Sequence, residues 1–188
     1  KQPDFLMLGN LTPSIQKRAI DQITNKPKLT VLDTMNFWMD NYLEDLKTVI
    51  KEVDVLTIND EEARQLSGEY SLRKAAEIIL NMGPKYLIIK KGEHGSLLFD
   101  QKEMFFAPAL PLRNVLDPTG AGDSFAGGFV GYLDQNQEIS FGVMKKALIN
   151  ASAIASFCVE KFGTERLVEI TKKDLDKRLL EFVKLVSF

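Results

Sequence analysis

Residues 117–129 read Asp117-Pro118-Thr119-Gly120-Ala121-Gly122-Asp123, then Ser-Phe-Ala-Gly-Gly-Phe, and this stretch decides the expected fold and chemistry. The stretch Leu112–Leu116 predicts a strand before it, and the small-residue run predicts a helix after it. A glycine-rich turn at a helix N-terminus presents free amides and the positive end of the helix dipole, which favour an anion. Asp123 would repel a phosphate there unless it had another role. We infer that it takes a proton from a hydroxyl that attacks the phosphate.

The same stretch resembles the second signature of the ribokinase-like (PfkB) family of small-molecule kinases, and the match continues through Gly127 and Gly128. The resemblance implies that Asp123 is the general base. It also implies that the amides of Gly120, Ala121 and Gly122 hold the transferring phosphoryl group. The alternative is an ordinary glycine-rich strand-to-helix turn, and the flanking pattern favours the signature.

Composition excludes several other classes of protein. The chain has 188 residues, is 45% hydrophobic and carries a net charge of −2, so it predicts a real core and no basic surface for nucleic acid or membrane. The single Cys158 cannot form an internal disulfide, and we expect a buried, inert thiol. No run is long enough to span a bilayer and no signal peptide is visible, so we expect a cytoplasmic protein.

Strand-like runs alternate with amphipathic helical runs along the chain, which predicts an α/β fold with a mostly parallel sheet. The expected strands and the hairpin cover residues 5–8, 29–33, 53–58, 86–90, 96–100, 103–107 and 112–116. The expected helices cover residues 12–23, 41–52, 60–66, 71–82, 140–158 and 171–186. The resemblance implies a three-layer αβα, doubly wound sheet of the ribokinase-like kind, with ligands outside the carboxyl ends of the strands.

The beginning of the chain is unusual for this family. The first residue is Lys, and the run Phe5–Leu8 predicts a strand almost at once. The resemblance covers residues 1–188 as one nucleotide-binding and catalytic domain, which corresponds to the C-terminal portion of a family member. We therefore expect the substrate-contacting N-terminal part and its β lid to be missing, with a sheet edge or a second segment where they belong. The sequence leaves open whether the protein forms a homodimer through that lid.

Polar residues follow two of the expected strands. Asn59 and Glu62 are spaced N-x-x-E, one helical turn apart, and the resemblance implies that Glu62 organises Mg²⁺ largely through water. The alternative is an Asn N-cap followed by acids that the helix dipole favours. A family turn whose backbone approaches the nucleotide phosphates is matched by Lys90, Gly92 and Gly95. The family often has Thr at the position of Lys90, so the role of the Lys90 side chain is open. The same turn reads equally as a simple hairpin.

Three further features have open roles. Asp33 and Asn36 resemble a polar family segment at the floor of the active site, beside Trp38, which either walls a substrate pocket or packs in the core. Asn150 resembles a family residue near the adenine. His94, the only histidine, reads as an exposed bystander.

A monovalent cation, K⁺ in the family, is implied beneath the signature turn. Asp117, the carbonyl of Thr119 and the loop near Gly163 match its ligands.

We conclude from the sequence that the chain belongs to an ATP- and Mg²⁺-dependent phosphotransferase with an alcohol group as acceptor, acting on a sugar. A nucleoside kinase is the second candidate, because the same signature serves both. A non-catalytic nucleotide-binding domain is the third. A dinucleotide oxidoreductase is discounted, because Gly9-Asn10-Leu11-Thr12 lacks the G-x-G-x-x-G pattern after the first strand.

Overall fold

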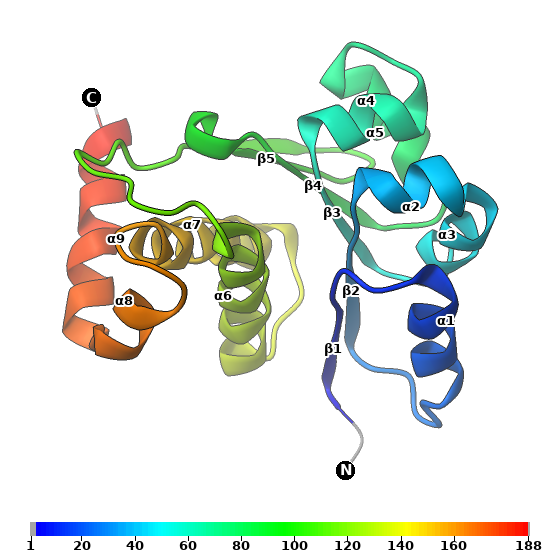
Figure 1. Ribbon diagram of the computed structural model, residues 1–188, viewed down its shortest axis with the longest axis horizontal. Coiled ribbons are helices and arrows are strands. Elements are labelled where there is room, and N and C mark those ends of the chain that lie inside the picture. Colours follow the sequence, from blue (N-terminus) through cyan, green and yellow to red (C-terminus); the bar gives the residue numbers. More distant parts are fainter. Residues whose placement is uncertain (1–2, 188) are drawn as a thin grey trace. The chain divides into compact units, whose positions relative to one another are not determined.

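One sheet of six strands in sequential order, β1-β2-β3-β4-β5-β6, organises the computed structural model, which describes residues 3–187 (Figure 1). The first four strands run parallel and the last two are short. The strands are β1 (Phe5–Leu8), β2 (Leu29–Asp33), β3 (Val55–Asn59), β4 (Tyr86–Lys90), β5 (Ser96–Phe99) and β6 (Met104–Ala107). The predicted α/β class with a mostly parallel sheet is confirmed.

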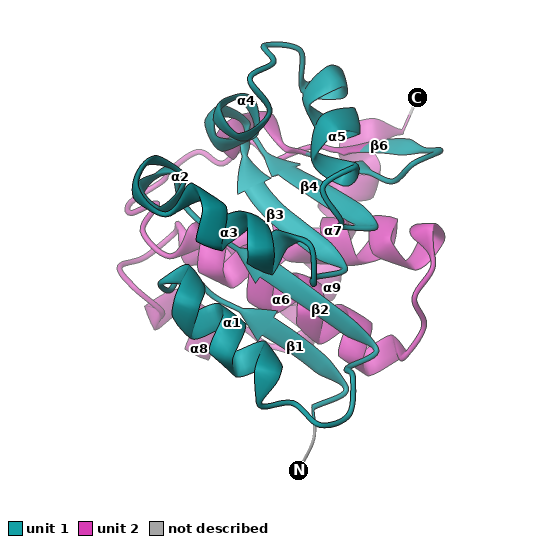
Figure 2. Cartoon of the chain, turned by 90° about the vertical axis from the view of Figure 1, so that its right-hand side faces the viewer, with its two compact units in different colours: residues 1–91, 97–105 teal, residues 92–96, 106–188 magenta. Residues whose placement is uncertain are grey.

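The described chain divides into two compact units (Figure 2). Unit 1 comprises residues 1–91 and 97–105, and unit 2 comprises residues 92–96 and 106–188. The single domain expected over residues 1–188 stays a prediction.

Unit 1 contains the parallel strands and the helices that connect them. These helices are α1 (Pro13–Asp21), α2 (Asn36–Asn41), α3 (Leu43–Ile50), α4 (Asp60–Ser67) and α5 (Leu72–Leu80). They lie on the same face of the parallel strands (Figure 2). Right-handed crossovers require this arrangement when each new strand is added to the same edge of the sheet.

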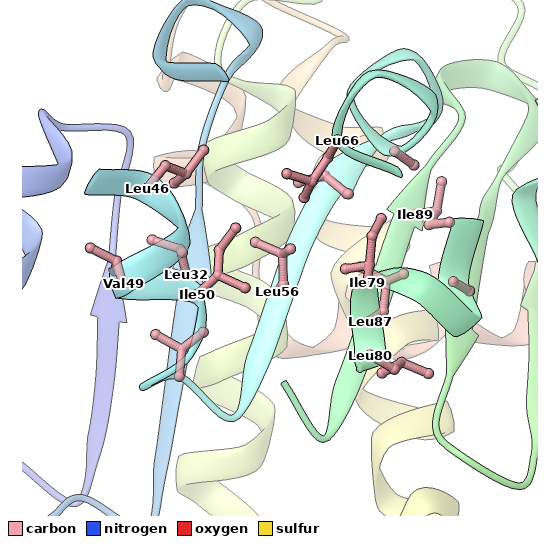
Figure 3. Close-up of a cluster of buried hydrophobic side chains, with 14 of the residues drawn as sticks. Leu32, Leu46, Val49, Ile50, Leu56, Leu66, Ile79, Leu80, Leu87 and Ile89 are labelled. Atoms are coloured by element: carbon pink, nitrogen blue, oxygen red, sulfur yellow. The ribbon is translucent and has the colours of Figure 1, made fainter. Parts of the chain in front are cut away.

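The core of unit 1 forms between this face of the sheet and the helices (Figure 3). β2 is buried along its whole length. Leu56 and Ile79 illustrate the packing, because both are fully buried, one from β3 and one from α5. Burial of each such side chain stabilises the fold by about 1.5–3 kcal/mol.

Unit 2 is helical. It contains the short turn η1 (Gly92–His94) and the helices α6 (Ala121–Asn136), α7 (Phe141–Cys158), α8 (Glu165–Glu169) and α9 (Lys172–Val186). Helix α7 contacts α6, α8 and α9. The long buried helix predicted over residues 140–158 is confirmed, with Ser140 as its N-cap.

One element prediction was wrong. The expected strand Leu112–Leu116 is irregular, because the Leu116 amide donates to the carbonyl of Val159, just after the end of α7, at 2.8 Å and not to a neighbouring strand. The helix expected over residues 41–52 is present as α3, shorter at both ends, and the short helix α2 before it was not expected; the two helices meet at Tyr42, with φ −142° and ψ 38°. The Tyr42 ring lies 5.6 Å from the Trp38 ring, four residues earlier in the chain.

Among residues 3–187, no helix is both long enough and apolar enough to cross a membrane.

Candidate active site

The signature turn forms the N-terminus of α6 in unit 2. Gly120 is the N-cap and adopts a left-handed conformation, with φ 80° and ψ 0°, which glycine accepts without strain. The Ala121 amide donates to the carbonyl of Pro118 at 3.1 Å. Among residues 3–187, no acceptor meets the amides of Gly120, Gly122 and Asp123. Free donors therefore lie in this turn at Gly120, Gly122 and Asp123, whereas the Ala121 amide is already used inside it.

Asp123 is in the first turn of α6 and its side chain is exposed. A carboxylate three residues into a helix is favoured by the helix dipole. The same first turn therefore presents free amides and an accessible carboxylate, which is the combination that proton removal beside a bound phosphate requires.

Residues from the end of α7 hold this turn. Cys158 is buried, and its Sγ lies 3.7 Å from the carbonyl oxygens of both Thr119 and Gly163. The Thr119 amide donates to Asp117 Oδ1 at 2.9 Å. That amide, with the Thr119 hydroxyl and more weakly the Gly163 amide, lowers the pKa of the Asp117 carboxyl below its ordinary value.

The residues implied for a monovalent cation are therefore neighbours. Asp117, Thr119 and Gly163 offer oxygen atoms, which hard cations prefer, around the Cys158 thiol.

In unit 1, Asn59 and Glu62 form a reciprocal capping box at the start of α4. The Glu62 amide donates to Asn59 Oδ1 and the Asn59 amide donates to Glu62 Oε2, both at 2.8 Å. Glu62 is 6% exposed. Asn59 is therefore the N-cap of α4, as the alternative interpretation predicted. The capping box does not decide whether Glu62 also organises Mg²⁺.

The electrostatic surroundings of Glu62 are unusual for a helix cap. Burial raises the pKa of the Glu62 carboxyl above its ordinary value, against the lowering effects of the Asn59 amide and of the charge on Lys90. Within residues 3–187, no three His, Cys, Asp or Glu side chains are grouped to hold a metal ion. These residues fit Mg²⁺ only if most of its ligands are water.

Lys90 neither points to solvent nor stands alone at the end of β4. Its Nζ donates to Asp33 Oδ1 at 2.8 Å, and the two side chains are only 20% and 10% exposed. Lys90 is paired in register with Asn59, so the ammonium reaches past the end of β3 to the end of β2. This buried ion pair at the carboxyl ends of the strands was not predicted from the sequence.

The glycine turn after β4 belongs to unit 2. Gly92 and Gly95 have φ 56° and 84°, and a Cβ at Gly95 would lie 2.2 Å from the carbonyl oxygen of Ala107. A side chain at position 95 would therefore collide with Ala107, so the hairpin needs glycine at this position. This clash supports the interpretation of the turn as a simple hairpin. His94 is 74% exposed, in agreement with the bystander interpretation.

The Trp38 side chain packs partly against the core of unit 1. Its indole N–H donates to Asn10 Oδ1 at 2.7 Å, and its ring meets Phe37 edge-on at 4.9 Å. Asn36, at the start of α2, is exposed, and its side chain accepts from the Phe37 amide. Core packing therefore accounts for one face of Trp38, with its polar edge toward the segment after β1.

Asn150 lines a pocket of about 360 Å³ in unit 2. The other lining residues are mostly small or polar residues of α6, joined by residues of α7 and α9: Gly127, Gly128, Gly131, Tyr132, Gln135, Ile154 and Leu175. Gly128 is needed for close packing of α6 on α7, because a Cβ there would lie 3.1 Å from Ile154. Gly127 has open space at that position instead.

Comparison with known proteins identifies the family. The profile described as pfkB family carbohydrate kinase matches residues 5–171, so the chain belongs to this family. The ribokinase-like fold expected from the sequence is also shown. The fructokinase from Vibrio cholerae O395 superimposes with a TM-score of 0.81 over 95% of this chain and 61% of that chain, at 19% identity.

Two curated relatives differ in their acceptors. The cytidine kinase of Thermococcus kodakarensis is 32% identical over 128 residues, which is 65% of this chain and 45% of that protein. The ribokinase of Lactococcus lactis subsp. lactis is 30% identical over 173 residues, which is 92% of this chain and 54% of that protein. The chain thus spans about half the length of these curated relatives.

Proposed function

We propose that this chain carries the phosphoryl-transfer machinery of an ATP-dependent kinase whose acceptor is a hydroxyl of a sugar. The observation that carries the proposal is the N-terminus of α6, where the free amides of Gly120 and Gly122 adjoin the exposed carboxylate of Asp123. Membership of the pfkB family supports it.

In this proposal Asp123 accepts the proton of the attacking hydroxyl. The free amides stabilise the charge that develops on the transferring phosphoryl oxygens, a contribution of about 3–4 kcal/mol for a well-placed donor. Because the Ala121 amide is bonded to Pro118, we assign the anion role to Gly120, Gly122 and the Asp123 amide, with Ala121 joining them only if that bond opens.

The remaining site residues serve the nucleotide. Asn59 and Glu62 would act on hydrated Mg²⁺, which supplies charge neutralisation on the phosphates when bound. Lys90 and the turn at Gly92 and Gly95 lie at or just after the carboxyl end of β4, where ligands of parallel sheets bind. Asn150 would contact the base from the α6–α7 pocket.

A monovalent cation is a further part of the proposal. Asp117 and the carbonyls of Thr119 and Gly163 would hold K⁺ beside Cys158. Such a cation would keep the turn in the geometry that presents its amides.

The second candidate is a nucleoside kinase. The specific observation in its favour is the cytidine kinase of T. kodakarensis, at 32% identity. The same machinery serves either acceptor, since only the positions that contact the acceptor need differ.

An acceptor screen tests the proposal. The intact protein that contains this sequence is incubated with ATP and Mg²⁺, and ADP formation is followed with pentoses, hexoses and nucleosides. We expect ADP formation that depends on one acceptor class, with a sugar first. A protein that binds ATP but forms no ADP with any acceptor would contradict a kinase and support a non-catalytic nucleotide-binding domain.

A further inference from the structure

The signature turn of unit 2 depends on two residues at the end of α7. The amides of Leu116 and Asp117 both donate to the carbonyl of Val159, at 2.8 and 3.4 Å. The neighbouring Cys158 lies against the carbonyl of Thr119 on one side and that of Gly163 on the other. The position of the turn is therefore set by where α7 ends.

Helix α9 holds that same end of α7 through Arg178. Its Nη1 donates to Ser156 Oγ at 2.7 Å and its Nη2 to Glu160 Oε1 at 2.6 Å. Its guanidinium carbon also lies 3.9 Å from the centre of the Phe157 ring. One side chain, 11% exposed, thus contacts residues on both sides of Cys158 and Val159.

Glu160 connects a second arginine to this group. Its other oxygen, Oε2, accepts from Arg166 Nε at 3.0 Å, and the Arg166 guanidinium lies 5.5 Å from the Phe157 ring. Charge-assisted bonds are stronger than neutral ones, and a planar guanidinium that stacks and donates at two points cannot be replaced by lysine without loss. Such a cluster fixes geometry more firmly than an exposed ion pair does.

We propose that Arg178 is a positioning residue for phosphoryl transfer, acting through the end of α7 on the signature turn. The inference rests on the proposed function of that turn. In this proposal α9 supplies the guanidinium, α7 transmits its position, and Val159 and Cys158 place the segment that leads to Gly120.

Arg178→Gln tests this, with Lys177→Gln as the matched control, because Lys177 is the exposed neighbour on the same helix. Two readouts are taken on the intact protein below its unfolding temperature. The first is the rate at which a thiol reagent labels Cys158, located by peptide mass spectrometry. The second is kcat and the acceptor KM with ATP.

We expect Arg178→Gln to label Cys158 about tenfold faster, because local opening exposes a buried thiol. We expect kcat to fall about tenfold with the acceptor KM within about twofold, because a small displacement of positioned groups affects the transition state most. Arg178→Lys should give intermediate values for both, and Lys177→Gln should match the wild type.

Arg178→Gln with wild-type labelling and wild-type kcat would overturn the proposal, and so would an unchanged kcat with faster labelling. If Arg178→Gln does not fold, Arg178→Lys decides by the same two readouts. If the wild-type protein transfers no phosphate but Cys158 is still labelled faster in Arg178→Gln, the coupling between α9 and the turn is supported. The same result contradicts the assignment of the protein as a kinase.

Discussion

At the scale of single residues, the least expected feature is the ion pair between Lys90 and Asp33. Both side chains are largely buried at the carboxyl ends of the strands. Breaking a buried ion pair from one side is strongly destabilising, because it leaves the other charge in a poorly solvated place.

We therefore predict that Lys90→Met lowers the free energy of unfolding by about 2–4 kcal/mol in urea denaturation. Lys91→Met is the control, because Lys91 follows directly and forms no such short pair among the described residues. Adding Asp33→Asn to Lys90→Met should restore part of the stability, since the buried carboxylate is then gone. Equal effects of the two lysine variants would show that the pair contributes nothing.

Glu62 gives a second prediction at this scale. Because burial raises the pKa of Glu62, the folded protein binds this proton more tightly than the unfolded chain does. Glu62 therefore stabilises the folded protein most at low pH. This contribution declines as the pH rises from the ordinary carboxyl pKa through the raised pKa of Glu62 in the folded protein. Glu62→Gln should remove this decline, whereas Glu61→Gln, exposed in the same turn, should keep it. A stability–pH curve unchanged by Glu62→Gln would contradict this assignment.

At the scale of elements, the two adjacent glycines of α6 have different surroundings. A Cβ at Gly128 would meet Ile154 at 3.1 Å and Ala151 at 3.2 Å, whereas a Cβ at Gly127 would meet nothing within 4 Å. We predict that Gly127→Ala stabilises the protein by about 0.5–1 kcal/mol through helix propensity. Gly128→Ala should instead destabilise it by about 1–3 kcal/mol through overpacking against α7. Thermal unfolding of both variants checks this, and a stabilising Gly128→Ala would show that α6 and α7 do not pack as described.

What the sequence predicted well at this scale was local. The strands of unit 1 carry continuous apolar runs, and Asn59 caps α4, as one of the two interpretations of that residue predicted. The expected strand Leu112–Leu116 failed because it depends on a distant partner. The hydrogen bond from the Leu116 amide to Val159 joins residues whose proximity no local pattern encodes.

The same distinction applies to the candidate site. The turn at Gly120 could be predicted because glycine is required by its left-handed backbone. The partner of Lys90 and the role of Arg178 could not, since each depends on a contact across the fold. The engaged amide of Ala121 is a detail of turn geometry that the motif alone does not reveal.

At the scale of the whole molecule, the chain combines a parallel α/β unit with a helical unit that carries the signature turn. The pfkB profile spans residues of both units, from 5 to 171. We propose that one carboxylate of the helical unit, that of Asp123, removes the acceptor proton during phosphoryl transfer.

The decisive measurement compares kcat of the intact protein with that of its Asp123→Asn variant. The amide keeps the size of the side chain but cannot accept the hydroxyl proton, so kcat should fall by at least about 100-fold. ATP affinity, measured by calorimetry, should stay within about threefold of the wild type. Asp134→Asn, exposed later on the same helix, should leave both unchanged. A loss of kcat below about tenfold for Asp123→Asn would contradict the assignment of Asp123 as the base.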